Sequence, residues 1–282
     1  MTDGPDLESE GPDFYRAPSV EPGPAEEERF SVLSDHLLGP IQLVRLGVEV
    51  GFQAPGWIIG LTLLIGLPIN LGLELLLPEV GSLGDMVRAF RVNALLETWL
   101  GSLRDIGVIF VVGRVVAGER PGLLAVLSTV LRRYLPVVGY RILLKVVLGF
   151  LALLLVVPAV IFWVFWLFVD VRLVLRPNAR NDAPTASRMV VEGRWFRVAG
   201  TALVTQLGWF VVVMIVSTPL SLFIEGMSDA LPARLAVSFI VDVLAVLAVV
   251  TLTLQYLNLE AVPPAEGFDP TSTSTNPGAG LS

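Results

Sequence analysis

The chain of 282 residues has no cysteine and only one histidine, His36. Without cysteine it can form neither a disulfide nor a thiolate metal site. A Ser-His-Asp triad would have to be built around His36, and a zinc site with two histidines is excluded. These absences disfavour most common hydrolase chemistry and leave mechanisms that use only carboxylates or arginine open. We expect no catalytic, cofactor-binding or metal-binding residues and a protein that is not an enzyme.

Charged residues are also scarce, at 16% of the chain against roughly 25% in a typical soluble domain, whereas hydrophobic residues reach 54%. Residues 1–30 contain nine acidic and two basic residues, which accounts for the whole net charge of −7. The rest of the chain is therefore neutral overall and has no basic stripe of the kind that binds nucleic acid. We expect the lipid bilayer as a partner and no nucleic acid.

Long apolar segments between two polar tails predict an all-α, polytopic membrane helix bundle. We expect residues 1–33, which are acidic, and 261–282 to be disordered, and residues 34–260 to form the membrane domain. A helix needs about 20 apolar residues to cross the bilayer. Six segments are the predicted transmembrane helices: Gly56–Leu77, Leu95–Ala117, Pro136–Val157, Ala159–Arg176, Val198–Ile224 and Ala233–Leu257. The turn between the third and the fourth is predicted at Pro158.

Three further segments, residues 36–53, 121–134 and 183–197, have the apolar periodicity of amphipathic helices. Each precedes a pair of predicted spans, and we expect each to be an interfacial elbow helix. The sequences RYLPVVG (133–139) and RWFRVAG (194–200) have equivalent positions and share Arg, Val and Gly. They favour a three-fold repeat of elbow and hairpin, although any elbow that needs these residues at an interface would show the same likeness.

The distribution of arginine predicts the orientation, because cytoplasmic loops carry an excess of positive residues. With the N-terminus inside, ten arginines fall in the inner segments and three, Arg88, Arg91 and Arg234, at the outer side. We therefore expect a multi-pass protein of the cell (plasma or inner) membrane with both termini in the cytoplasm. A membrane-protein partner or a homo-oligomer could pack on a glycine face such as Gly107–Gly113.

Polar residues inside the predicted spans are candidate functional residues, because a charge at mid-helix costs about 2.5–3.5 kcal/mol. Lys145 and Asp170 lie 13 and 12 residues from Pro158, so they are expected to form an ion pair across the hairpin. Arg104 and Asp242 share a depth in the outer half and are also expected to pair. The other candidates are Asp105, Asn70 and Glu74. All of them could stabilise the bundle, or line a polar or ion-coupling site.

The stretch VPAVIFWVFWLFVDVRLVL and the following APTASRMVVEGRWFRVAG resemble a group of six-helix bacterial and archaeal integral membrane proteins. The group includes the membrane domain fused to some glycerophosphodiester phosphodiesterases and the YciC-like proteins. The residues that match are Pro158, Ala186, Ser187, Gly193, Arg194 and Trp195. The resemblance covers roughly residues 34–260. It implies a six-helix fold and a membrane location but no activity.

Two functions fit these patterns. The first is a non-enzymatic membrane module, acting as a scaffold, a lipid-associated element or an accessory to another protein. The alternative is a small transporter or channel that uses the polar intramembrane residues. An intramembrane enzyme would need a reactive cluster, and the sequence shows none.

Overall fold

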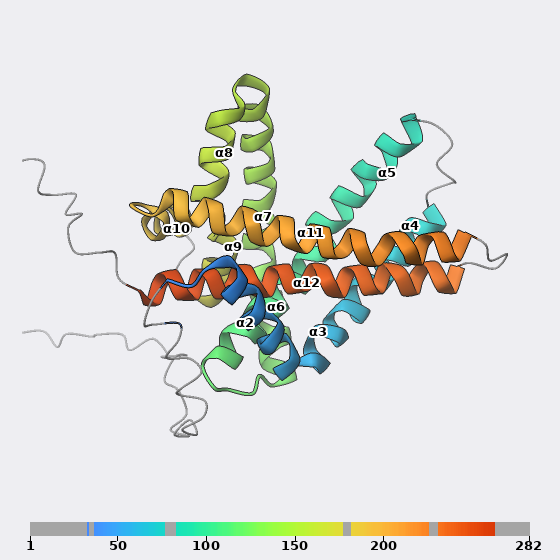
Figure 1. The fold of residues 1–282 in the computed structure, drawn as a ribbon, viewed down its shortest axis with the longest axis horizontal. Coiled ribbons are helices and arrows are strands. Elements are labelled where there is room, and N and C mark those ends of the chain that lie inside the picture. Colours follow the sequence, from blue (N-terminus) through green and yellow to red (C-terminus); the bar gives the residue numbers. More distant parts are fainter. Residues whose placement is uncertain (1–32, 34–36, 77–82, 177–181, 226–230, 263–282) are drawn as a thin grey trace, which may run out of the picture.

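The computed structural model describes residue 33 and residues 37–76, 83–176, 182–225 and 231–262 (Figure 1). These residues form helices and no strand, which confirms the all-α class. His36 and nearly all of the two predicted tails, 1–33 and 261–282, lie outside the described residues.

The helices follow one another closely along the chain. In order they are α2 (Pro40–Gln53), α3 (Pro55–Leu61), η1 (Thr62–Gly66), α4 (Leu67–Leu76), α5 (Leu83–Leu96), η2 (Glu97–Gly101), α6 (Ser102–Val116), α7 (Leu123–Leu154), α8 (Val156–Phe165), α9 (Val169–Leu175), α10 (Ala183–Val191), α11 (Trp195–Glu225) and α12 (Leu231–Ala261). The segments η1 and η2 are single π-helical turns inside longer helical runs.

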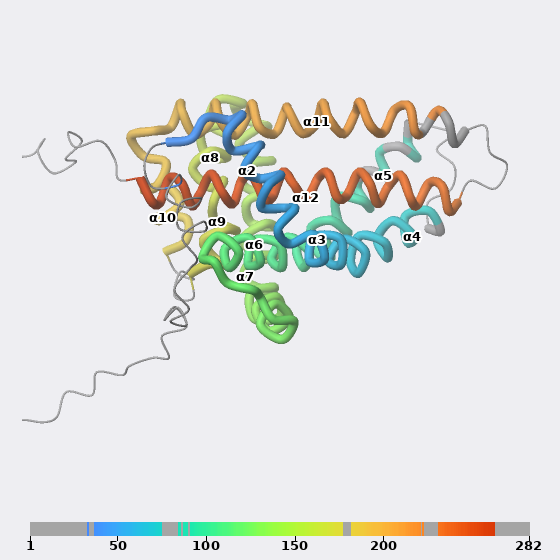
Figure 2. Tube along the Cα trace, turned by 60° about the horizontal axis from the view of Figure 1, so that its bottom comes forward, coloured from blue at the N-terminus to red at the C-terminus, as the bar shows by residue number. Residues whose placement is uncertain are grey.

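Helix α2 crosses α12 obliquely, α3 and α4 continue toward the far end of α12, and α11 packs beside α12 (Figure 2). At one end, the Leu38 N–H donates to Asn258 Oδ1 at 2.9 Å. At the other end, Arg234 Nη1 lies 3.6 Å from Glu74 Oε2. We call these the inner end and the outer end of α12.

Helix α6 lies in the centre of the molecule and brings the chain back toward the inner end. Its side chains are buried over most of its length. A Cβ added to Gly107 would stand 2.8 Å from Leu61 Cδ1, and one added to Gly113 would stand 2.6 Å from Leu175 Cδ2. Both glycines therefore serve packing within the chain, so the Gly107–Gly113 face is not free for a partner.

Five helical segments are long and apolar enough to cross a membrane. They are Pro55–Glu74, Leu123–Leu154, Val156–Leu175, Trp195–Leu220 and Leu231–Ala261. They coincide with five of the six predicted spans. The remaining span, Leu95–Ala117, is helical but carries Glu97, Arg104, Asp105 and Arg114, and it is not among the five. The chain is thus a multi-helix membrane-type protein, and a sixth span stays a prediction.

The hairpin of α7 and α8 differs from the prediction in two respects. Its turn is at Leu155, where the backbone is extended (φ −157°, ψ 120°), three residues before the predicted turn at Pro158. Pro158 itself lies in the first turn of α8, where proline is tolerated because the N–H groups of a first turn have no intrahelical acceptor. The hairpin also stands across α11 and α12 rather than alongside them (Figure 1). The α7–α8 hairpin and the α11–α12 pair cannot both be perpendicular to one flat bilayer. We therefore expect one of the two pairs to lie obliquely in the membrane.

The second predicted elbow segment turns its apolar stripe away from the protein, whereas the first and the third expose only part of theirs. Ala186 of the third stripe is buried, and Leu37 of the first and Val190 of the third pack against the core. Ile41 on α2 is 83% exposed, Leu124 on α7 80% and Phe196 on α11 86%. The protein-facing side of α2 consists of other residues, among them Leu43 and Gly47. Two of the predicted elbows contain a separate helix, α2 within residues 36–53 and α10 within residues 183–197. Residues 123–134, by contrast, are the first part of the long helix α7. The interfacial position of these segments and the three-fold repeat remain predictions.

Candidate functional site

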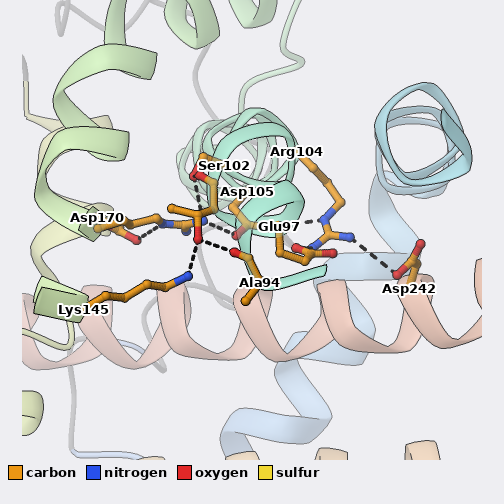
Figure 3. Close-up of polar contacts among 10 residues, drawn as sticks. Ala94, Glu97, Ser102, Arg104, Asp105, Lys145, Asp170 and Asp242 are labelled. Carbon is orange, nitrogen blue, oxygen red and sulfur yellow. Dashed lines mark hydrogen bonds and ion pairs between the residues drawn. The ribbon is translucent and has the colours of Figure 1, made fainter. Parts of the chain in front are cut away.

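A network of charged side chains lies where α6 meets α7, α9 and α12 (Figure 3). It comprises four carboxylates and three cations: Glu97, Asp105, Asp170 and Asp242, with Arg104, Arg141 and Lys145. Five of the predicted candidates are therefore close together in the structure. A sixth, Asn70, contacts the network through Asp242.

Arg104 holds three of the carboxylates. Its Nη2 lies 3.2 Å from Glu97 Oε2, its Nε 3.3 Å from Asp105 Oδ1 and its Nη1 3.7 Å from Asp242 Oδ1. The guanidinium side chain is only 6% exposed. The predicted pairing of Arg104 with Asp242 is confirmed. Within the described structure Nη1 has no hydrogen-bond partner, so this pair rests on charge alone.

On its other side, Asp242 contacts the first of the five apolar segments, Pro55–Glu74. Asn70 Nδ2 donates to Asp242 Oδ2 at 2.7 Å. A Cβ on Gly66 would stand 2.7 Å from the same oxygen, so glycine at this position leaves the space that the carboxylate occupies. Glu74, the last predicted candidate, lies apart from the network and pairs with Arg234 at the outer end.

Arg141 is the second centre of the network and was not predicted. Its Nε lies 2.6 Å from Asp170 Oδ2 and its Nη1 2.9 Å from Asp105 Oδ2. Nη1 also donates to Ser102 Oγ at 3.0 Å. One side chain of α7 therefore ties together α6 and α9. Such two-sided contacts suit the guanidinium group, whose five N–H donors are arranged in a fixed fork.

The ion pair predicted between Lys145 and Asp170 is wrong, because Asp170 pairs with Arg141 instead. Lys145 Nζ donates to the hydroxyl of Thr98. The position of the turn explains the difference. From Leu155, Arg141 lies 14 residues back and Asp170 15 residues forward, about 21 and 22 Å along the two helices, whereas Lys145 lies only 10 residues back.

The π-helical turn η2 (Glu97–Gly101) positions the edge of the network next to α6. A Cβ on Gly101 would collide with Glu97 Oε2, so the missing side chain gives Glu97 its place beside Arg104. Thr98 and Ser102 each donate to the carbonyl four residues earlier, Ala94 and Thr98. Their hydroxyl oxygens then accept from Lys145 and Arg141. Single π-turns within α-helices occur frequently at functional sites.

A second polar cluster joins α9 to α12 at the inner end. Arg172 Nη1 donates to the hydroxyl of Tyr256 at 3.2 Å. Glu260 lies 2.8 Å from Arg176 Nη2 and 3.6 Å from Arg172 Nη1. Its residues lie near the ends of their helices, where long side chains reach the polar region of a membrane.

The charge network can do two things chemically. It can lock the helices together, because each carboxylate has an arginine neighbour. It can also take up a positive charge, because four carboxylates face three cations, and Glu97 and Asp170 are 36% and 27% exposed. No group of three His, Cys, Asp or Glu side chains in the described part of the chain is arranged to hold a metal ion. A small cavity between α2, α3 and α6 has only apolar lining residues, so it offers no polar ligand site.

Comparisons with known proteins add no relative. No protein-family model matches the chain, no curated protein is similar to it, and no solved structure matches it. The role of the network therefore has to be inferred from its own geometry.

Proposed function

We propose that the protein is a multi-pass integral membrane module without a catalytic site, which acts as a scaffold, a lipid-associated element or an accessory to another membrane protein. The charge network carries this proposal. Arg104 and Arg141 connect η2, α6, α7, α9 and α12 through their ion pairs. Charges committed to one another in this way fix the packing of helices, for which lipid supplies no hydrophobic driving force.

The termini of the membrane domain support the proposed topology. Asn258, near the end of α12, accepts from the Leu38 N–H and donates to the carbonyl of Leu33 at 2.7 Å. Both ends of the domain therefore meet at the inner end of α12, which requires an even number of passes. Helix α6 supplies the extra pass to the five apolar segments, since it leads from Asp242 back to the inner end. We propose six spans with both termini in the cytoplasm.

The resemblance to the membrane domain of glycerophosphodiester phosphodiesterases and to YciC-like proteins also remains a proposal. Its matching residues have defined local roles. Ser187 Oγ donates to the carbonyl of Phe165 at 2.7 Å and fixes α10 against the end of α8. Gly193 has φ +77°, a conformation that favours glycine, and it turns the chain from α10 into α11.

Ion flux across liposomes tests the proposed function. We would reconstitute the full chain into liposomes that contain a pH-sensitive dye, impose a proton gradient with a potassium diffusion potential, and compare the dye response with that of empty liposomes. A scaffold or accessory module should give the same response as empty liposomes. Proton flux that is lost in Asp242→Asn and kept in Glu74→Gln, a carboxylate outside the network, would refute it.

That outcome would support a second candidate, a small proton- or cation-coupled transporter or channel. The observation that favours it is the excess of one carboxylate over the cations of the network. A net negative charge in a low-dielectric interior is costly and favours the binding of a proton or a cation. The partly exposed Glu97 and Asp170 would be the points where this ion enters or leaves.

A further inference from the structure

The elbow between α10 and α11 presents two arginines for which the described part of the chain supplies no acidic partner. Arg194 Nη1 donates to the carbonyl of Leu259 at 3.3 Å, and Arg197 Nη2 donates to the carbonyl of Leu37 at 2.7 Å. Neither side chain forms an ion pair with an acidic side chain of the described residues. A guanidinium has five N–H donors, so the described residues leave most of the donors on both side chains for another acceptor.

Among the described residues, the charge of the two arginines is not compensated locally. Arg194 directly precedes α11 and Arg197 lies in its first turn. The carbonyls that they contact belong to Leu259 and Leu37, whose neighbours Asn258 and Leu38 are hydrogen-bonded to each other. Burial, followed by the positive charge of Arg197, lowers the pKa of the Arg194 guanidinium. The acidic side chains nearby pair with other arginines, Glu192 with Arg188 and Glu260 with Arg176. The elbow is therefore a place where a negative charge would be attracted.

The depth of this pair relative to lipid follows from its neighbours on α11. Phe196, between the two arginines, begins a stripe of exposed apolar side chains that continues along the helix with Leu203, Leu207 and Phe210. The steps of seven, four and three residues keep these side chains on one face. If this face is in contact with acyl chains, Arg194 and Arg197 are at the level of the headgroups, where aromatic and arginine residues are typically found.

We infer that Arg194 and Arg197 form a binding site for the phosphate of an anionic phospholipid whose acyl chains lie along the exposed face of α11. Two guanidinium groups match the oxygens of one phosphate, and the backbone carbonyls of Leu259 and Leu37 hold both groups in place. This inference rests on the proposed membrane location. It goes further, since it assigns a ligand class to residues outside the charge network.

The membrane location is tested first, by extracting membranes that contain the full chain with alkaline carbonate. Release of the chain would refute the proposed function. If the chain is retained, the purified protein is titrated with phosphatidylglycerol or with zwitterionic phosphatidylcholine in detergent, and bound lipid is counted by native mass spectrometry. We expect selective binding of phosphatidylglycerol. Equal binding of the two lipids would overturn the lipid site and leave the membrane location intact.

Variants then locate the site. Arg194→Gln with Arg197→Gln should weaken phosphatidylglycerol binding about 30-fold, from the attraction that two arginines contribute near an anionic lipid. The matched control, Arg45→Gln with Arg188→Gln, removes two exposed arginines that already pair with Glu49 and Glu192, and it should bind as the unmodified chain does. An equal loss in both variants would mean general electrostatic attraction and would overturn the site.

Two further arms keep the result interpretable. Arg194→Lys with Arg197→Lys keeps both charges, so this variant should retain most of the phosphatidylglycerol binding. A charge-based site would be contradicted if the lysine variant lost as much binding as the glutamine variant while its melting temperature stayed unchanged. Inorganic phosphate is the probe for a soluble ligand. If millimolar inorganic phosphate displaces the lipid from the unmodified chain, the site takes free phosphate and the lipid assignment is wrong.

Discussion

The most direct test of the charge network is a double-mutant cycle between Arg141 and Asp170. Arg141→Met leaves Asp170 without its partner at 2.6 Å and removes one of the two arginines at Asp105. Breaking a buried ion pair by removing one partner costs about 3–5 kcal/mol. Because Asp170 is 27% exposed and Asp105 keeps Arg104, we expect the lower end, about 3 kcal/mol.

The reverse change should cost less. Asp170→Asn leaves Arg141 paired with Asp105 at 2.9 Å and bonded to Ser102, so we expect a loss of about 1–2 kcal/mol. In the Arg141→Met background the charge of Asp170 is already unpaired, so its neutralisation should recover part of the loss. The two single losses then exceed the loss of the double variant by at least about 1–2 kcal/mol, which is the coupling energy.

The assay is reversible unfolding in mixed micelles of a mild detergent and sodium dodecyl sulfate, followed by circular dichroism. Lys145→Met is the control, because Lys145 is one turn from Arg141 and contacts Thr98 rather than Asp170. Its effect should add to that of Asp170→Asn within about 0.5 kcal/mol. The register of the hairpin would be refuted if the effects of Arg141→Met and Asp170→Asn were additive. It would also be refuted if the coupling energy between Lys145 and Asp170 were larger than that between Arg141 and Asp170.

Three further predictions concern packing, topology and the tails. Gly47→Ala should destabilise the fold by about 1–3 kcal/mol in the same assay, because the added Cβ would stand 2.6 Å from Thr251 Oγ1. Gly60→Ala is the control, because a Cβ at Gly60 would meet open space and should not destabilise the fold. Equal effects of the two changes would contradict the packing of α2 against α12. In the cysteine-free chain, an impermeant maleimide should label Ser228→Cys from outside and leave Ser274→Cys unlabelled; external labelling at residue 274 would reject the topology. Removal of residues 1–30 and 263–282 should leave membrane insertion and yield unchanged, and a shortened chain that fails to accumulate would show that a tail contributes to folding.

The sequence is sufficient to predict most of the helices, though not α5, and five of the seven charged residues of the network. Apolar length alone locates five of the spans, and the cost of a charge in lipid identifies Arg104, Asp105 and Asp242 as side chains that need partners. Depth counted along two helices is enough to pair Arg104 with Asp242. These inferences succeed because they depend on local composition and on the fixed rise of the helix.

The pairing across the α7–α8 hairpin cannot be predicted as reliably, because it depends on the exact residue of the turn. Proline is a common turn residue, which favours a turn at Pro158, but it is equally tolerated within the first turn of a helix. Placing the turn three residues earlier moves the partner of Asp170 by about one helical turn, from Lys145 to Arg141. The crosswise direction of the hairpin depends on packing between distant segments and has no signal in the local sequence (Figure 1).

Helix α6 shows why a predicted span can be missing from the five segments that are apolar enough to cross a membrane. A hydropathy criterion measures how well a segment tolerates lipid on all sides. Helix α6 is surrounded by other helices, and Arg104 and Asp105 are buried among them rather than exposed to lipid. A central helix can therefore carry charges that a peripheral span cannot, provided that each charge has a partner. The predicted span that is absent from the five apolar segments is the one around which the charge network is built, which is why we expect it to cross the membrane with the other five.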